Sequence, residues 1–129
     1  MATLTITNAR PVKVIEQHTW PNGESLTKGK YGRLSSLGKA ELGNATSAGE
    51  VGFGGIVVGE DGANTVTIVR KGLVDVGEGL ASLAFGAAVY LSDTDGTFGD
   101  TAGTVSTIVG RVVPGWSNTT ADKLLCMDL

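Results

Sequence analysis

The stretch that decides the fold is residues 65–91, TVTIVRKGLVDVGEGLASLAFGAAVYL. Residues 65–71 alternate between two parities, which is the two-residue period of a half-buried β-strand. After Gly72, the run 73–76 is expected to continue this strand beyond a glycine bulge. Residues 87–92 predict a further strand. The stretch describes a small, tightly turned β-module without the side chains that covalent chemistry needs, and such modules act through their surfaces.

The flanking sequence continues this pattern in both directions. Short apolar runs are separated by turn signals that contain glycine or proline, and residues 80–85 are expected to form one helical turn or a loop. The further expected strands are 51–58, 106–113 and 123–129, with turns at Glu60-Asp61-Gly62, Asp93–Gly96 and Pro114–Asn118. This spacing predicts an all-β fold, a compact β-barrel or sandwich with short turns, in a single β-rich domain over residues 21–129.

Residues 1–20 are predicted to be an extended N-terminal arm. Residues 3–7 alternate and predict one strand, Asn8–Pro11 is expected to break it, and residues 12–16 form a second extended run before the Trp20–Gly23 turn. An extended strand without a packed partner normally pairs with a sheet edge, in its own sheet or in another chain.

The segment 24–49 carries no clear period. Its glycines argue against a long helix, because a glycine inside a helix costs about 1 kcal/mol relative to alanine. We expect loops with one short strand or turn, and an exposed polar loop over residues 44–49.

Composition excludes several classes of function. The net charge of −3 and the dispersed basic residues give no electrostatic footprint for nucleic acid, and aromatic residues, at 5%, are too few for base stacking. Glycine, with 20 of 129 residues, is abundant enough to supply many turns and bulges. The sequence carries no signal-peptide pattern and no apolar run of membrane-spanning length, so neither export by a signal peptide nor a membrane span is expected.

Candidate chemical sites each have a plainer interpretation. His18 is the only histidine and cannot build a zinc site, and Cys126 is the only cysteine, expected as a small buried apolar residue. Gly52–Gly55 precedes a β-branched run rather than a helix, so its glycines are interpreted as a bulge or close packing rather than a phosphate loop. Asp93–Gly96 with Asp100 lacks the ligand pattern of a calcium loop and is interpreted as a hairpin turn. The sequence thus predicts no catalytic residue, metal or cofactor.

Trp20 and Trp116 both stand beside turn residues rather than within an alternating strand. Each is interpreted either as a buried side chain that seals an edge or as a contact for a partner, since tryptophan is enriched at binding hot spots.

From Gly55 onward the order of elements resembles the tailed-bacteriophage capsid decoration (cement) proteins. The residues that carry the resemblance are Gly55–Val58, the strand 65–70, Gly72-Leu73-Val74, Phe85–Leu91 before an Asp-Gly turn, Ile108–Val112 and the apolar terminal strand. The resemblance implies a homotrimer on the outer surface of the virion, made in the host cytoplasm. It would bind the major capsid protein at three-fold or quasi-three-fold sites and hold its subunits against the pressure of packaged DNA, without nucleic-acid or membrane partners.

In such a protein the arm could add a strand to a capsid sheet edge. The expected capsid-binding residues are Ala2, Thr3, Leu4, Thr5 and Ile6, with Trp20 and Trp116 as candidate interface aromatics. Two other hypotheses stay open. One is a surface binding module, such as a head-fibre base or a glycan-binding domain, in which the tryptophans line a groove. The other is a small β-barrel enzyme that uses His18 or Cys126.

Overall fold

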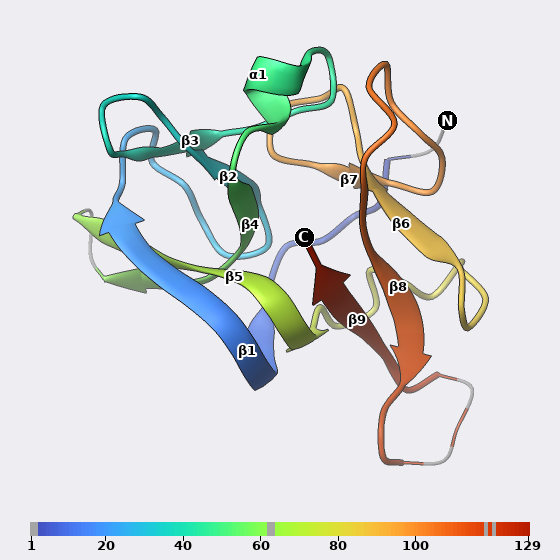
Figure 1. Cartoon of the computed structure of the whole chain (residues 1–129). Coiled ribbons are helices and arrows are strands. Elements are labelled where there is room, and N and C mark those ends of the chain that lie inside the picture. Colours follow the sequence, from blue (N-terminus) through green and yellow to red (C-terminus); the bar gives the residue numbers. More distant parts are fainter. Residues whose placement is uncertain (1–2, 62–63, 118, 120) are drawn as a thin grey trace.

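The protein is all-β: a computed structural model has one antiparallel sheet of nine strands curled into a half-barrel, with almost no helix (Figure 1). It describes residues 3–61, 64–117, 119 and 121–129. The elements are β1 (Arg10–Pro21), β2 (Tyr31–Leu34), β3 (Ala40–Leu42), α1 (Ala48–Val51), β4 (Gly54–Asp61), β5 (Thr65–Asp75), β6 (Ala88–Leu91), β7 (Phe98–Gly99), β8 (Ile108–Pro114) and β9 (Lys123–Asp128).

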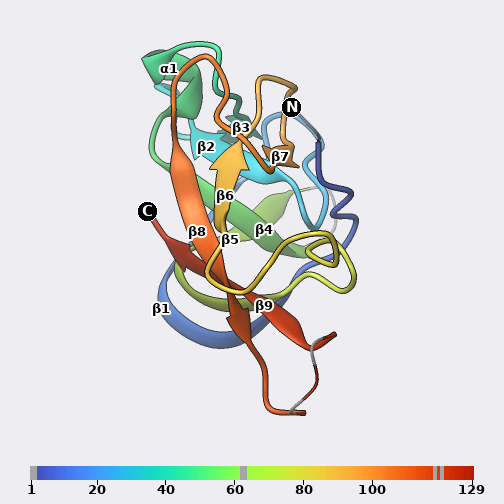
Figure 2. The ribbon, with the colours of Figure 1, turned by 90° about the vertical axis from the view of Figure 1, so that its right-hand side faces the viewer.

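Strand β5 is the centre of the sheet. The hydrogen-bonded order is β3-β2-β4-β5-β9-β8-β6-β7, and β1 pairs with β5 outside this path. The first half of β5 pairs with β4 and its second half with β9, while β1 follows the other side of β5 along its whole length. Figure 2 shows β1 and β5 curving together side by side. Strand β5 therefore connects the β3-β2-β4 part of the sheet to the β9-β8-β6-β7 part.

Alternating side chains of the strands fill the inside of the half-barrel. On β5, Val66 and Ile68 are buried as the alternation of residues 65–71 predicts, whereas Val69, on the other parity, is buried as well. Tyr31 and Phe98 meet edge to face in the main core, with ring centroids 6.1 Å apart. A smaller second cluster comprises Leu26, Ala40, Val57, Val66 and Ile68.

Two predicted roles of glycine are confirmed. Gly96 has a φ of +68° in the turn between β6 and β7, and so occupies the left-handed region that an Asp-Gly turn requires. Gly55 lies where β4 passes close to β5, and a Cβ atom there would be 2.1 Å from the carbonyl oxygen of Val69. Gly52–Gly55 thus permits close backbone packing.

The structure differs from the prediction at the N-terminal end. The expected strand over residues 3–7 is not formed: Thr3 makes a single β-bridge, and residues 4–9 lie outside any strand. The second extended run, β1, already starts at Arg10, so Pro11 lies inside a strand rather than in the break before it. A proline is tolerated here because β1 has a neighbour on one side only among the described strands, so a missing N–H on the open side breaks no ladder. The expected turn after Trp20 is present, with the Asn22 side chain accepting a hydrogen bond from the Leu26 N–H at 2.9 Å.

The segment before β4 is also more ordered than predicted. It forms β2 and β3 rather than one short strand, and the expected exposed loop over residues 44–49 is only partly exposed. Asn44 and Ala45 are buried, and the short helix α1 begins after Ser47, whose side chain accepts the Glu50 N–H. Ser47 caps the helix, and the sequence signal for that cap was missed.

Candidate interaction surface

Two of the predicted capsid-binding residues, Thr3 and Leu4, contact β7 of the same chain. Thr3 forms a β-bridge with Gly99, and the Leu4 N–H donates to the Phe98 carbonyl at 2.8 Å. The side chains of Leu4 and Ile6 are both buried in the main core, while Thr3 and Thr5 are exposed. Ala2 lies outside the described residues. In this structure the backbone of the arm therefore pairs with an edge strand of its own domain.

Trp20 belongs to an aromatic group in which the rings pack against one another. Its ring stacks on His18 at a centroid distance of 5.2 Å and contacts Phe53 at 6.0 Å. The Arg70 guanidinium lies 3.8 Å from the centroid of the Phe53 ring. Trp20 also packs against the second core cluster. These contacts favour the interpretation of Trp20 as a side chain that seals an edge.

A shared carboxylate ties this aromatic group to the sheet. Glu16 lies 2.8 Å from His18 Nε2 and accepts a hydrogen bond from Arg70 Nη1 at 3.0 Å. These two contacts, with His18 the larger cause, hold the pKa of Glu16 below its usual value of 4.5. Arg70 can reach Glu16 because it is the extra residue of a bulge: Glu16 pairs with Lys71 and Gln17 with Val69.

Glu16→Gln is expected to make stability less dependent on pH in the acid range. A carboxyl whose pKa is lowered by folding stabilises the native state above its unfolded pKa, and this contribution is lost as the pH falls through the folded value. The measurement is the urea midpoint from about pH 6 to about pH 3. Wild type should lose more over this range than the Gln variant. Parallel losses in the two proteins would contradict the role of Glu16.

Trp116 lies in the connection between β8 and β9, and 76% of its surface is exposed. The backbone N–H and the hydroxyl of Ser117 both donate to Asp122 at 2.7 Å, which lowers the pKa of that carboxyl. Asn118 and Thr120 lie outside the described residues. The exposed indole leaves Trp116 as a candidate contact for a partner.

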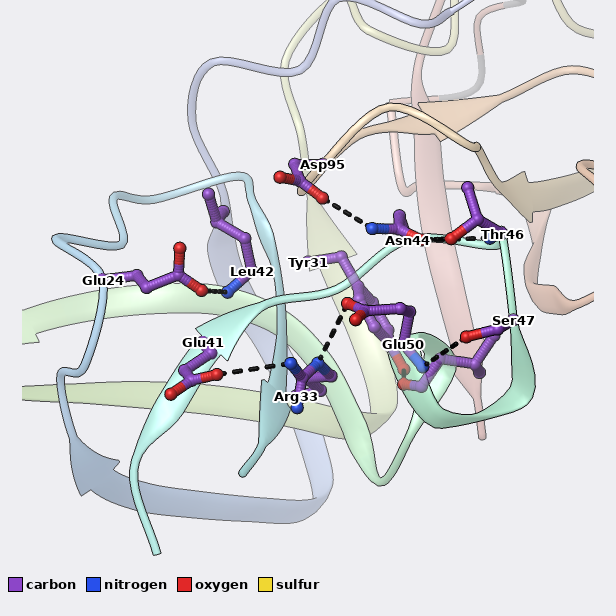
Figure 3. Close-up of polar contacts among 11 residues, drawn as sticks. Glu24, Tyr31, Arg33, Glu41, Leu42, Asn44, Thr46, Ser47, Glu50 and Asp95 are labelled. Carbon is purple, nitrogen blue, oxygen red and sulfur yellow. Dashed lines mark hydrogen bonds and ion pairs between the residues drawn. The ribbon is translucent and has the colours of Figure 1, made fainter. Parts of the chain in front are cut away.

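Polar contacts around Arg33 organise the opposite end of the sheet (Figure 3). Arg33 donates to Glu41 at 3.2 Å and lies 3.6 Å from Glu50 of α1, so it joins β2 to β3 and to the helix. The Tyr31 hydroxyl donates to the Val51 carbonyl at 2.8 Å. These side chains hold α1 against the sheet and have a structural role.

The acidic residues of the predicted turn also have structural partners. Asp93 accepts hydrogen bonds from the N–H and hydroxyl of Thr104, both at 2.8 Å, and Asp95 accepts one from Asn44 at 2.6 Å. Within the described part of the chain, no three His, Cys, Asp or Glu residues are grouped so as to hold a metal ion. Likewise, no helix among the residues described is long and apolar enough to cross a bilayer.

The outer face of β1, β5, β9 and β8 carries a row of basic and apolar side chains. Across these strands, Lys13 pairs with Leu73, Leu73 with Cys126, and Cys126 with Arg111. Their chain neighbours on β5, β9 and β8 point into the core, so this row points outward. Cys126 is consequently half-buried on this face, and its expected place in the core is wrong.

Two adjoining hollows flank Cys126 and Asp128 on this face. The first, of about 400 Å³, lies toward β1 and the second, of about 430 Å³, toward β8. Together they form what we call the outer groove, lined by Lys13, Ile15, Lys71, Leu73, Cys126, Asp128, Ile108, Arg111 and Val113.

Ile15 is exposed in the outer groove because of a bulge in β1. Val14 pairs with Gly72 and Glu16 with Lys71, which leaves Ile15 as the extra residue, with 72% of its surface exposed. A bulge is thus present beside Gly72, as expected, but its extra residue, Ile15, belongs to β1 and not to β5. Sequence reasoning missed the outer groove, because residues 71–75 (KGLVD) and 124–128 (LLCMD) do not alternate clearly enough to identify an outward face.

In comparisons with known proteins, no protein-family model, no curated protein and no solved structure matches the chain.

Proposed function

We propose that this protein is a non-enzymatic capsid decoration protein of a tailed bacteriophage. It binds the major capsid protein on the outer surface of the virion, as a homotrimer at three-fold or quasi-three-fold sites, and holds capsid subunits together against the pressure of packaged DNA. The resemblance of residues from Gly55 onward supports the family, and the open edge of β1 supports the mode of attachment.

Strand β1 is the observation that carries the proposal. It has 12 residues, and within the described chain it forms a ladder with β5 alone. Such an edge offers unpaired backbone groups to an incoming strand. The bulges at Val12 and Ile15 interrupt the first half of β1, whereas residues 17–21 pair with β5 in unbroken register. The regular second half is therefore the place where a capsid strand can add.

This edge is a more accessible attachment point than the arm. Transferring Leu4 and Ile6 from the core to a capsid would first expose both side chains, at a cost of about 1.5–3 kcal/mol each. The β1 edge is open without that rearrangement. Capsid binding through Thr3–Ile6 stays a prediction, and it requires the arm to leave β7.

The proposal predicts that the purified protein binds undecorated heads of its parent phage and is seen at three-fold positions by electron microscopy. Replacing Gln17 and Thr19 by lysine places two charges on the β1 edge, which disfavours strand addition. Binding of this double variant is expected to weaken about tenfold or more. The control is Ser36→Lys with Leu37→Lys, which adds the same charge at exposed positions before β3.

The two outcomes separate the function from its mechanism. Wild-type protein that does not bind heads would contradict the decoration function. Wild-type binding that the Gln17/Thr19 double variant retains in full would leave the function but exclude the β1 edge. Both variants need thermal unfolding curves, because Thr19 loses a hydrogen bond to the Thr67 hydroxyl.

The alternative function is a surface binding module, such as a head-fibre base or a glycan-binding domain, and the exposed indole of Trp116 favours it. Trp20 does not supply the second aromatic wall, because its ring packs on His18 and Phe53. A glycan array without hits would remove the glycan-binding form.

A further inference from the structure

We propose that the outer groove binds an extended segment of a partner protein in which acidic and apolar side chains alternate. This inference goes beyond the decoration function and does not depend on it, because the groove's shape and charge are properties of this chain alone.

The floor and walls of the groove are apolar. Leu73, Cys126 and Val113 are partly buried along the floor, and Ile15 and Ile108 stand at the two sides with 72% and 42% of their surfaces exposed. Neighbouring strands lie about 4.8 Å apart, so the path from β1 to β8 is about 14 Å long. Extended chain rises about 3.4 Å per residue, and four or five residues therefore cross the groove.

The charged residues of the groove are mainly basic. Lys13 and Lys71 lie at the β1 end and Arg111 at the β8 end. The one acidic residue in the lining is Asp128, and it already lies 3.2 Å from Lys71 Nζ. Three basic groups and one acidic group give the groove a formal charge of 3 − 1 = +2, although the whole chain carries −3. The groove thus concentrates positive charge on an acidic protein.

This charge determines which occupant fits. A second copy paired groove to groove would bring two faces of the same sign together, and like charges across an interface are unfavourable. The phosphates of a nucleic acid would pair with the basic side chains of the groove, but Ile15 and Ile108 would be left without apolar partners. A segment with carboxylates on one side and aliphatic side chains on the other meets both demands, with its apolar side on Leu73 and its carboxylates beside Lys13 and Arg111.

Fluorescence anisotropy with the full-length protein tests the inference. The probe is a fluorescein-labelled peptide of alternating glutamate and valine, and the control probe has lysine at each glutamate position. We expect saturable binding of the acidic peptide that weakens with added salt, and at least tenfold weaker binding of the lysine peptide.

Two protein variants separate the groove from general charge effects. Lys13→Glu with Arg111→Glu should weaken binding of the acidic peptide about tenfold or more. Lys28→Glu with Lys39→Glu changes the net charge equally at exposed positions away from the groove lining and should alter affinity less than twofold. Ile15→Ser removes an apolar wall at a bulge position and should also weaken binding, with an unchanged unfolding temperature.

Three results would overturn the inference. The first is the absence of saturable binding of the acidic peptide to the wild-type protein. The second is an equal loss of affinity in the Lys28/Lys39 control, which would mean that charge alone drives association. The third is tighter binding of a single-stranded oligonucleotide with the same number of charges, which would assign the groove to nucleic acid.

Discussion

Gly55→Ala is expected to lower the free energy of unfolding by about 3 kcal/mol, the upper part of the range for overpacked cores. The added methyl group would be 2.1 Å from the Val69 carbonyl oxygen, and the carbonyl carbon would be 2.7 Å away. Both atoms belong to the backbone of β5, so neither can move aside as a flexible side chain would. Relief requires β4 and β5 to separate at this point of the sheet.

Gly59→Ala is the matched control for this change, because Gly59 lies in the same strand. Its nearest neighbour for an added Cβ is the Thr67 Cβ at 3.6 Å, which is an ordinary contact. The control should change stability by less than about 0.5 kcal/mol. Urea unfolding of the three proteins measures both values. Similar midpoints for Gly55→Ala and Gly59→Ala would mean that β4 and β5 do not approach as closely as described.

The second large effect is a loss of stability at alkaline pH that depends on Tyr31. Burial raises the pKa of Tyr31 to about 12, against an ordinary value of 10.0. The native state therefore keeps the phenol proton over a range in which the unfolded chain releases it. Stability from this source is complete below about pH 10 and falls as the pH rises through about 12. The shift corresponds to a loss of about 2–3 kcal/mol.

Tyr31→Phe separates this contribution from the titration of lysines, which both proteins share. At neutral pH the variant should be less stable by about 1 kcal/mol, because the Val51 carbonyl loses its donor. Between about pH 10 and pH 12 it should lose less stability than wild type. Chemical denaturation at several pH values compares the two slopes. Equal slopes would show that Tyr31 titrates normally and is open to solvent.

Local patterns in the sequence predicted most of the strands correctly. The alternation of residues 65–71 identified β5, and the Asp95-Gly96 pair identified the turn before β7, because both signals depend on neighbouring residues. The break between the two extended runs was predicted to include Pro11, which instead lies in β1. The effect of a proline on a strand depends on whether the missing N–H faces a neighbour, which a single sequence does not reveal.

Tertiary pairing explains why the outer groove was not found from the sequence. Leu73, Cys126 and Arg111 are far apart in the chain, and they become neighbours only because β9 inserts between β5 and β8. Residues 124–128 form a largely apolar run, so even the outward face of β9 has no clear signal in the sequence. The register that aligns the three faces is set by the whole sheet, including the bulges of β1, and no local signal carries it.

The position of β9 also has a consequence for how the protein is made. This strand is the last in chain order, yet it lies between β5 and β8 (Figure 1). While the chain is being synthesised, both neighbours must therefore wait with open edges until residues 123–128 have left the ribosome. The nascent chain passes through a stage in which two apolar strands can join with the wrong partners, so slow elongation through the codons for residues 115–128 would prolong exposure to aggregation.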